Sequence, residues 1–410
     1  MPRFLFTSLF SNDLGLVTRT VPIASELASL GHEIAFCSPA QTPARLIEEA
    51  GFHNLQPNLR FIPTIWPPNT TEVWNVDHFS ALTGNLDENW VRGNCEAFME
   101  LAAGFGADVI VDSWNLSACI AARVLGRPLV SVIQADMHPQ SRGLIWWKEP
   151  PPDVPTPVPV INKVLAEYGL APIGSTGELH VGDLTLVVGT PETDPLPETA
   201  DVTYIGPILW QTPQAELPDW ANALSRRKPV VWVYTGNPSY GAHISWADSI
   251  LVLHACIEAL ADQKVQVVLT TGHHALPENV TPLPANFHYE AYVPGLAMAE
   301  RADLLVHHGG QGACLIGPYT GTAAVIIPTY SERESNARRM AALGVAELVL
   351  PAEDASGERR VPVEELRVKV KKVLSDPSFA LNARQLGEKM RAYGGAAGAA
   401  RRIDEFLRRV

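Results

Sequence analysis

Short apolar runs alternate with segments of helical periodicity, and this alternation occurs twice along the chain. In the first half, apolar runs at residues 4–9, 33–37, 108–111 and 129–133 are separated by helical patterns that end at glycines. The alternation begins again at residue 230. Buried strands that alternate with helices form βαβ units and a mostly parallel sheet. We therefore predict an α/β fold with two Rossmann-like domains in tandem.

The composition changes between residues 206 and 229, where four prolines lie among polar residues and two tryptophans. Such a segment is typical of an interdomain linker. A chain of 410 residues also fits about two domains. We expect an N-terminal domain at 1–212, a C-terminal domain at 213–394, and a final helix at 395–410 that can pack back on the N-terminal domain.

The chain is acidic, with a formal net charge of −13. This charge argues against a nucleic-acid partner and against an anionic membrane surface, since both require basic protein surface. An acidic protein can still bind phosphate through backbone N–H groups or a helix N-terminus. No stretch approaches the roughly 18 apolar residues of a membrane span, so we expect no integral membrane association.

The cysteines are five in number and form no C-x-x-C pair. Neither a disulfide framework nor a zinc motif follows from their spacing, which fits a reducing cytoplasm. Residues 1–10 carry one arginine and a short apolar run that Asn12 and Asp13 interrupt, so we expect a first strand and not a signal peptide. No carboxylate cluster suggests a metal site.

The most informative stretch is His-His-Gly-Gly-Gln-Gly-Ala at residues 307–313, which follows an apolar run and opens a helical pattern. Glycines let backbone N–H groups approach an anion, and a helix N-terminus favours negative charge. His308 can donate to a phosphate oxygen and can carry charge near neutral pH. The stretch is neither a Walker loop nor a dinucleotide fingerprint. A plain strand-to-helix turn is the alternative interpretation.

An acidic residue follows the next apolar run and its Pro328. Glu332, at the carboxyl end of a predicted strand, can accept hydrogen bonds from sugar hydroxyls. The alternative is that Glu332 and Glu334 simply begin a helix, where acidic residues favour the helix dipole.

The order of strand, H-G-G-x-G, strand, proline, acid and Asn336-Ala337 resembles the donor site of the UDP-glycosyltransferase superfamily. That family has the GT-B fold, two Rossmann-like domains facing a central cleft, and includes bacterial natural-product and macrolide glycosyltransferases. The resemblance covers most of the chain and extends to residues 15–33, 231–237 and 292–294. It implies that the N-terminal domain binds the acceptor and the C-terminal domain binds the nucleotide sugar.

The resemblance also implies roles for particular residues. The diphosphate would be bound by His308 and the amides of Gly309, Gly310, Gln311, Gly312 and Ala313, with Gly236 and Asn237 near it. Tyr292 and Val293 would hold the base, and Glu332 and Arg333 would face the sugar.

The sequence departs from the family at the catalytic base. The family's base is a histidine in the first strand-to-helix loop, where this chain has Leu16. The aspartate that orients that histidine matches Asp112. Asp13, in the same loop as Leu16, is our first candidate for the base, although it could instead cap the helix. His138 is a second candidate, although it could simply line a pocket.

The donor site departs from the family too. Ala313 replaces a hydroxyl residue, Ile316 replaces a glutamate that contacts ribose, and Glu332-Arg333 replaces the usual Asp-Gln pair. We also expect Pro318 to shorten the helix. One hypothesis is that Arg333 favours an acidic sugar.

The irregular, tryptophan-rich region 61–147 fits an acceptor pocket for a lipophilic or aromatic molecule, because aromatic faces bury much area. Its candidate residues are Trp66, Trp114, Met137 and His138, although core packing would also explain such residues. The function that follows is an inverting, metal-independent sugar transfer from a UDP or dTDP sugar to a hydroxyl of a small-molecule acceptor. The alternatives are a catalytically silent nucleotide-sugar-binding homologue and a GT-B-like epimerase or hydrolase.

Overall fold

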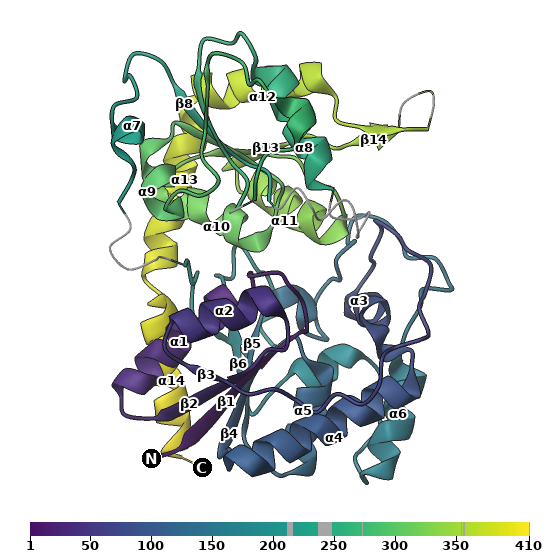
Figure 1. The fold of residues 1–410 in the computed structure, drawn as a ribbon. Coiled ribbons are helices and arrows are strands. Elements are labelled where there is room, and N and C mark those ends of the chain that lie inside the picture. The colour runs from purple at the N-terminus through teal and green to yellow at the C-terminus, as the bar shows by residue number, and fades with distance from the viewer. Residues whose placement is uncertain (211–215, 237–247, 273, 354, 356, 410) are drawn as a thin grey trace. The chain divides into compact units, whose positions relative to one another are not determined.

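The computed structural model describes the chain except residues 211–215, 237–247, 273, 354, 356 and 410. The chain divides into two compact units (Figure 1). Unit 1 comprises Met1–Pro68, Trp74–Ile208 and Ala392–Val410, and unit 2 comprises Asn69–Val73 and Leu209–Arg391. Asn237, which the resemblance places near the diphosphate, lies outside the described residues.

Unit 1 is built on a seven-stranded parallel sheet with the order β3-β2-β1-β4-β5-β6-β7. The strands are β1 (Arg3–Ser8), β2 (Glu33–Cys37), β3 (His53–Asn54), β4 (Val109–Ser113), β5 (Leu129–Ile133), β6 (Leu184–Val187) and β7 (Thr203–Tyr204). The helices are α1 (Val17–Ser29), α2 (Gln41–Glu49), α3 (Val76–Ser80), α4 (Glu88–Phe105), α5 (Leu116–Val124), α6 (Val158–Glu167) and α14 (Gly395–Leu407), with short turns η1 (Ala81–Asn85), η2 (Ala135–Met137) and η3 (Thr176–His180). The central strands are almost wholly buried because helices cover both faces. The C-terminal α14 packs along α1 (yellow beside purple in Figure 1).

Unit 2 is built on a six-stranded parallel sheet with the order β10-β9-β8-β11-β12-β13. Its strands are β8 (Val230–Tyr234), β9 (Gln266–Thr270), β10 (Phe287–Tyr289), β11 (Leu304–His307), β12 (Ala324–Ile326) and β13 (Ala346–Leu348), and β14 (Ala352–Glu353) pairs separately with β15 (Arg359–Arg360). The helices are α7 (Asp219–Asn222), α8 (Ser249–Leu260), α9 (Gly295–Arg301), α10 (Gln311–Thr320), α11 (Ser331–Ala342), α12 (Val363–Ser375) and α13 (Pro377–Arg391), with a short turn η6 (Glu278–Val280). Two parallel sheets with helices on their faces confirm the predicted Rossmann-like architecture.

A segment from the first half of the chain is part of unit 2. Residues 69–73 run past the start of α11, where the Ser331 N–H donates to the Thr71 carbonyl at 3.1 Å. The Val73 N–H in turn donates to Ser331 Oγ at 2.6 Å. These bonds fix the first turn of α11 against a segment distant in sequence.

The strand order reverses once in each sheet. In unit 1 the reversal lies between β1 and β4, and in unit 2 it lies between β8 and β11. In open parallel sheets, ligands bind beyond the carboxyl ends of the strands at such a point, because the two adjoining loops diverge there. The loops after β1 and β4, and those after β8 and β11, are therefore the places to examine for a site.

Pro318 does not shorten its helix as expected. Helix α10 continues through Pro318 to Thr320 and ends at Gly321, whose φ of 83° suits a glycine. The N–H groups of Gly321 and Thr322 close the helix end on the carbonyls of Pro318 and Gly317. The missing proline amide is thus tolerated near the carboxyl end of the helix.

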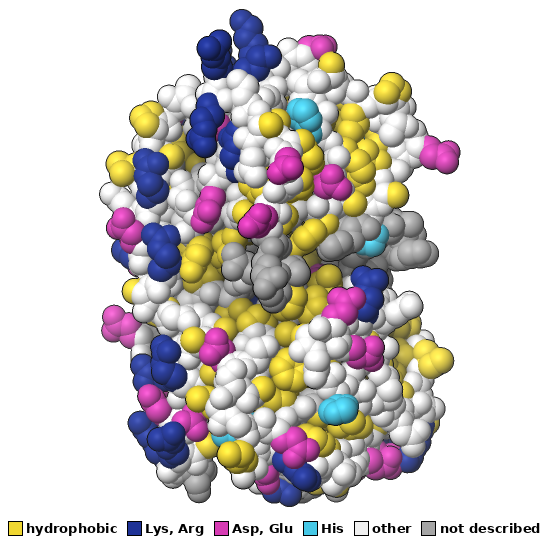
Figure 2. Space-filling model, turned by 60° about the vertical axis from the view of Figure 1, so that its left-hand side comes forward, with side chains coloured by type: hydrophobic (Ala, Val, Ile, Leu, Met, Phe, Trp, Pro, Cys, Tyr) yellow, Lys and Arg dark blue, Asp and Glu magenta, His cyan; other side chains and the backbone are white. Residues whose placement is uncertain are grey.

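Charged side chains of both signs lie among one another on the face of the molecule in Figure 2. No helix within the described residues is long and apolar enough to cross a bilayer. All five cysteines are buried and unbridged.

Helix α13 supports α10 through a glycine contact. A Cβ on Gly387 would lie 2.3 Å from the carbonyl oxygen of Pro318, so the two backbones can approach only without a side chain there. We predict that Gly387→Ala lowers the free energy of unfolding by roughly 1–3 kcal/mol, because overpacking strains a close contact. The matched control is Gly104→Ala on α4, where a Cβ meets nothing within 4 Å. Urea unfolding of both variants measures the difference, and equal stability of the two would contradict the contact.

Candidate active site

The loop after β11 turns directly into α10 and leaves the start of that helix open. Gly309 has a φ of 91°, and a Cβ there would lie 2.9 Å from the Arg333 carbonyl oxygen, so the turn requires glycine. Gly310 occupies the N-cap position without any side-chain hydrogen bond to the helix. A Cβ on Gly312 would meet nothing within 4 Å. An uncapped, unobstructed helix N-terminus can bind an anion.

His308 lies beneath this loop at the point where the strand order reverses. Its side chain is buried, and Nδ1 has no hydrogen-bond partner among the described residues. Gly236, after β8, packs against the ring, since a Cβ there would lie 3.4 Å from His308 Nδ1. Burial, and then the nearby Arg333 charge, hold the pKa of His308 well below its usual range. This lowered pKa favours the neutral ring in the ligand-free protein, against the expectation that His308 can carry charge near neutral pH.

The first turn of α11 is bonded to the glycine loop. Asn336 Nδ2 donates to the Gly309 carbonyl at 3.1 Å and to Glu332 Oε1 at 2.7 Å. The Tyr330 hydroxyl donates to Glu332 Oε2 at 3.1 Å. The structure thus brings Glu332 next to the glycine loop. Asn336 was not predicted as a site residue, although its i,i+4 spacing from Glu332 places the two on one helix face.

The candidate base-binding residues follow β10. Val293 is buried, and its side chain packs in the core of unit 2 with Trp232 and Met298, so its backbone is the part that can meet a nucleobase. Tyr292 is half-buried. On α10, Ile316 Cδ1 lies 3.1 Å from the position of a Gly295 Cβ, so the side chain that replaces the family's ribose-binding glutamate packs towards α9.

In unit 1, the carboxylate of Asp112 ends β4 inside a hydrogen-bonded core. It accepts from Thr7 Oγ1 at 2.6 Å, from the Asn115 N–H at 3.0 Å and from Cys119 Sγ at 3.3 Å. Burial raises the pKa of Asp112 to about 7, against these hydrogen bonds. None of these partners is a general base. Asp112 therefore ties β1, β4 and α5 together.

Asp112 and Cys119 also form, with His180, the one group of three possible metal ligands within 4.8 Å of one another among the described residues. All three side chains are buried, and burial lowers the pKa of His180 to about 3. The Cys119 thiol donates its proton to Asp112, so a hydrogen bond already occupies both of these atoms. We therefore interpret these three residues as part of the core of unit 1.

Asp13 lies in the loop after β1 and is exposed. Its Oδ1 accepts the Gly15 N–H at 2.6 Å, and its own N–H donates to Ser11 Oγ at 3.0 Å. The bond between Gly15 and the Asp13 carboxylate forms a turn just before α1. Leu16 follows at the N-cap of α1 and is buried. The carboxylate is thus both accessible and part of the local turn.

Two acceptor candidates lie together beyond the carboxyl ends of β4 and β5. Trp114 has a φ of 72°, which is unusual for a bulky residue, and its ring stands edge-on to Phe79 at 4.9 Å. Its indole N–H is buried without a partner among the described residues. Trp114 packs in one apolar cluster with Met137, which is only 3% exposed.

The other two acceptor candidates are His138 and Trp66. His138 is buried, and its Nδ1 accepts the Gln140 N–H at 3.2 Å, so the neutral ring carries its proton on Nε2. Burial also lowers the pKa of His138. This tautomer donates a hydrogen bond and is a poor base. Trp66 is 55% exposed and donates to the Pro63 carbonyl at 3.2 Å.

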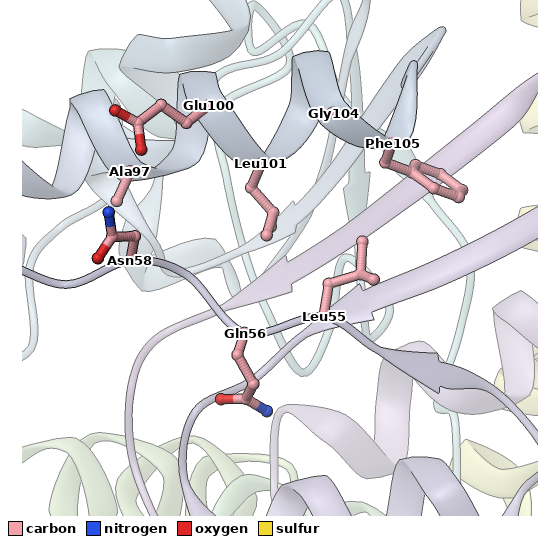
Figure 3. A pocket seen from close by; sticks show the side chains of 8 residues that line it. All are labelled: Leu55, Gln56, Asn58, Ala97, Glu100, Leu101, Gly104 and Phe105. Atoms are coloured by element: carbon pink, nitrogen blue, oxygen red, sulfur yellow. The ribbon is translucent and has the colours of Figure 1, made fainter.

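A pocket of about 450 Å³ opens elsewhere in unit 1 (Figure 3). It lies between the segment after β3 and the carboxyl half of α4, and it is lined by Leu55, Gln56, Asn58, Ala97, Glu100, Leu101, Gly104 and Phe105. None of these residues comes from the loops after β1, β4 or β5, so this pocket contains none of the predicted acceptor residues.

We predict that Asp112→Asn changes the pH dependence of stability. The folded protein keeps the Asp112 proton up to about pH 7, whereas the unfolded chain loses it near 3.8. The associated stability is complete below about pH 4 and is lost as the pH rises through about 7. The variant, which has no charge to bury, should exceed the wild type by on the order of 2–4 kcal/mol at about pH 8 and match it at about pH 4. Urea unfolding at both pH values decides this, and an unchanged pH profile would be evidence against it.

The chain is also similar to known proteins in sequence and in structure. Residues 254–405 match the family model of the erythromycin biosynthesis protein CIII-like C-terminal domain. A PGL/p-HBAD biosynthesis glycosyltransferase of Mycobacterium tuberculosis strain H37Ra is 29% identical over 332 residues, which cover 74% of this chain and 71% of that protein. The calicheamicin glycosyltransferase CalG4 superposes with a TM-score of 0.74 at 23% identity, over 100% of this chain and 99% of that one. The spinosyn rhamnosyltransferase SpnG complexed with thymidine diphosphate gives a TM-score of 0.69 at 18% identity, over 98% and 100%. These comparisons support the resemblance to the UDP-glycosyltransferase superfamily, and in particular to glycosyltransferases of natural-product biosynthesis.

Proposed function

We propose that this protein transfers a sugar from a UDP or dTDP sugar to a hydroxyl of a small lipophilic or aromatic acceptor, with inversion at the anomeric carbon and without a metal. The observation that carries the proposal is the open N-terminus of α10 at the reversal point of the unit 2 sheet, with a buried histidine beneath it. Such a site suits a diphosphate because backbone N–H groups and the helix dipole favour an anion.

The relatives support sugar transfer as the reaction class, since those named above are glycosyltransferases. One structural neighbour was solved with thymidine diphosphate, which supports a nucleoside diphosphate as the donor's leaving group. In this proposal His308 and the amides of residues 310–313 bind the diphosphate, whereas the Gly309 amide, also expected from the sequence to do so, already donates to His307 Nδ1 at 3.1 Å. Tyr292 and the Val293 backbone hold the base, and Glu332 contacts the sugar.

The acceptor is assigned to unit 1, where Trp114 and Met137 provide apolar surface beyond β4 and β5. A buried indole N–H without a described partner can donate to a polar group of the acceptor. A lipophilic or aromatic acceptor fits this chemistry.

In the transfer step, the acceptor oxygen forms a bond to the anomeric carbon while the bond from that carbon to the diphosphate oxygen breaks. The electron pair of the broken bond leaves with the diphosphate, and the hydroxyl proton passes to a base. We assign the base to Asp13, whose carboxylate is exposed in the loop where the family has its histidine. His138 is a weaker candidate because its Nδ1 already accepts a backbone N–H.

The Asp13→Asn variant tests the role of Asp13 as a base separately from its role in the turn. An asparagine oxygen can still accept the Gly15 N–H, but the side chain cannot take a proton at neutral pH. We predict that the variant loses about 10²–10⁴-fold in kcat while donor affinity is unchanged. Asp13→Ala should lose both the base and the turn. Full activity in the asparagine variant would show that Asp13 only shapes the loop.

The function itself is tested by incubating the protein with UDP and dTDP sugars, with and without a panel of phenols and macrolide aglycones. A glycosylated acceptor with inverted configuration is the expected product. Donor binding without turnover over the whole panel would favour a catalytically silent homologue, as Leu16 in place of the histidine would allow. Free sugar released without an acceptor would favour a hydrolase.

A further inference from the structure

Arg333, the third residue of α11, is a buried cation whose hydrogen-bonding capacity is largely unused. Its side chain is only 9% exposed, and its Nη1 donates to Thr329 Oγ1 at 3.0 Å. The guanidinium carbon lies 5.1 Å from the centre of the Tyr330 ring. A guanidinium has five N–H donors, and among the described residues the Thr329 bond is the one it makes. No carboxylate within the described part of the chain pairs with it. A buried positive charge that has no carboxylate partner strongly favours an anionic ligand.

Glu332, which precedes Arg333 in the sequence, is already hydrogen-bonded. Glu332 Oε1 accepts from Asn336, and Glu332 Oε2 accepts from the Tyr330 hydroxyl. The neighbouring Glu334 pairs with Arg338 at 2.6 Å, one turn further along the helix. Neither acidic residue of the first turn of α11 pairs with Arg333, so within the described residues its charge remains open to a ligand.

Arg333 adjoins the glycine loop. A Cβ on Gly309 would lie 3.1 Å from Arg333 Cβ, and the Gly309 carbonyl is held by Asn336 from the same helix. The Arg333 charge is also close enough to help lower the pKa of His308. The guanidinium, the histidine and the open start of α10 thus belong to one site.

The charges of this site do not balance a diphosphate without Arg333. His308 is neutral in the ligand-free protein, and a helix N-terminus supplies only about half an elementary charge. A nucleoside diphosphate carries at least two negative charges, and its terminal phosphate gains another as the bond to the sugar breaks. We propose that Arg333 is the cation that binds the terminal phosphate of the nucleoside diphosphate, and that it does not read the sugar. This inference rests on the proposed donor site.

The test compares the affinities of UDP, UMP and uridine, or of the thymidine series if the wild type binds it more tightly. We expect Arg333→Gln to weaken UDP binding by about tenfold to a hundredfold, because a charge-assisted hydrogen bond to phosphate is lost. UMP and uridine, which lack the terminal phosphate, should bind as to the wild type. Arg333→Lys keeps the charge and should recover part of the loss.

The matched control is Arg338→Gln, which removes the same charge from the same helix at a residue that pairs with Glu334. It should leave all three affinities unchanged. Thermal unfolding of each variant checks that the fold is intact, and the lysine variant keeps the test decisive if the glutamine variant does not fold.

Two outcomes overturn the inference while the proposed donor site stands. One is an equal loss for UDP and UMP, which would place Arg333 elsewhere in the site. The other is unchanged UDP affinity together with a lost preference for UDP-glucuronate over UDP-glucose, which would show that Arg333 binds a sugar carboxylate. Failure of the wild type to bind UDP, dTDP or their sugars would instead overturn the donor site itself, and this inference with it.

Discussion

The hydrogen bonds of Asn336 hold the candidate site together. One side-chain amide donates to the Gly309 carbonyl and to Glu332, and so joins the turn after β11 to the first turn of α11. Gly309 can offer that carbonyl because its backbone takes a left-handed conformation that a larger residue would resist. The open start of α10, the buried His308 and the orientation of Arg333 all depend on the position of this turn.

Burial decides which groups of the site carry charge. A histidine beneath a glycine loop suggests a switchable cation, but a buried imidazole beside an arginine stays neutral because desolvation and like charge both disfavour its protonation. An arginine keeps its charge under the same conditions. The same physics acts in unit 1, where burial raises the pKa of the Asp112 carboxyl. The pKa values of His308 in unit 2 and Asp112 in unit 1, two residues that match the family's pattern, are thus set by the residues packed around them.

At the carboxyl edge of the unit 1 sheet, Leu16 stands where the family has a histidine, yet the aspartate that matches the family's pattern is still present. Leu16 is buried before α1, and the Asp112 carboxylate bonds to Thr7, Asn115 and Cys119. Asp13 remains the exposed carboxylate of that loop. Trp114, held at a positive φ, marks the same edge as a place where the backbone is strained.

The two parallel sheets were predictable from the sequence, because the spacing of apolar residues and helix-ending glycines is a local property of each βα unit. It also located the glycine turn after β11 and the acid that follows β12. The folded structure was needed to show the lowered pKa of His308, the burial of Arg333 with few partners, and the bonds from residues 69–73 to Ser331. These properties could not be read from the sequence, because burial and hydrogen bonding depend on which distant segments come together. The sequence thus located the candidate anion site, and the fold decided which of its side chains carries the charge.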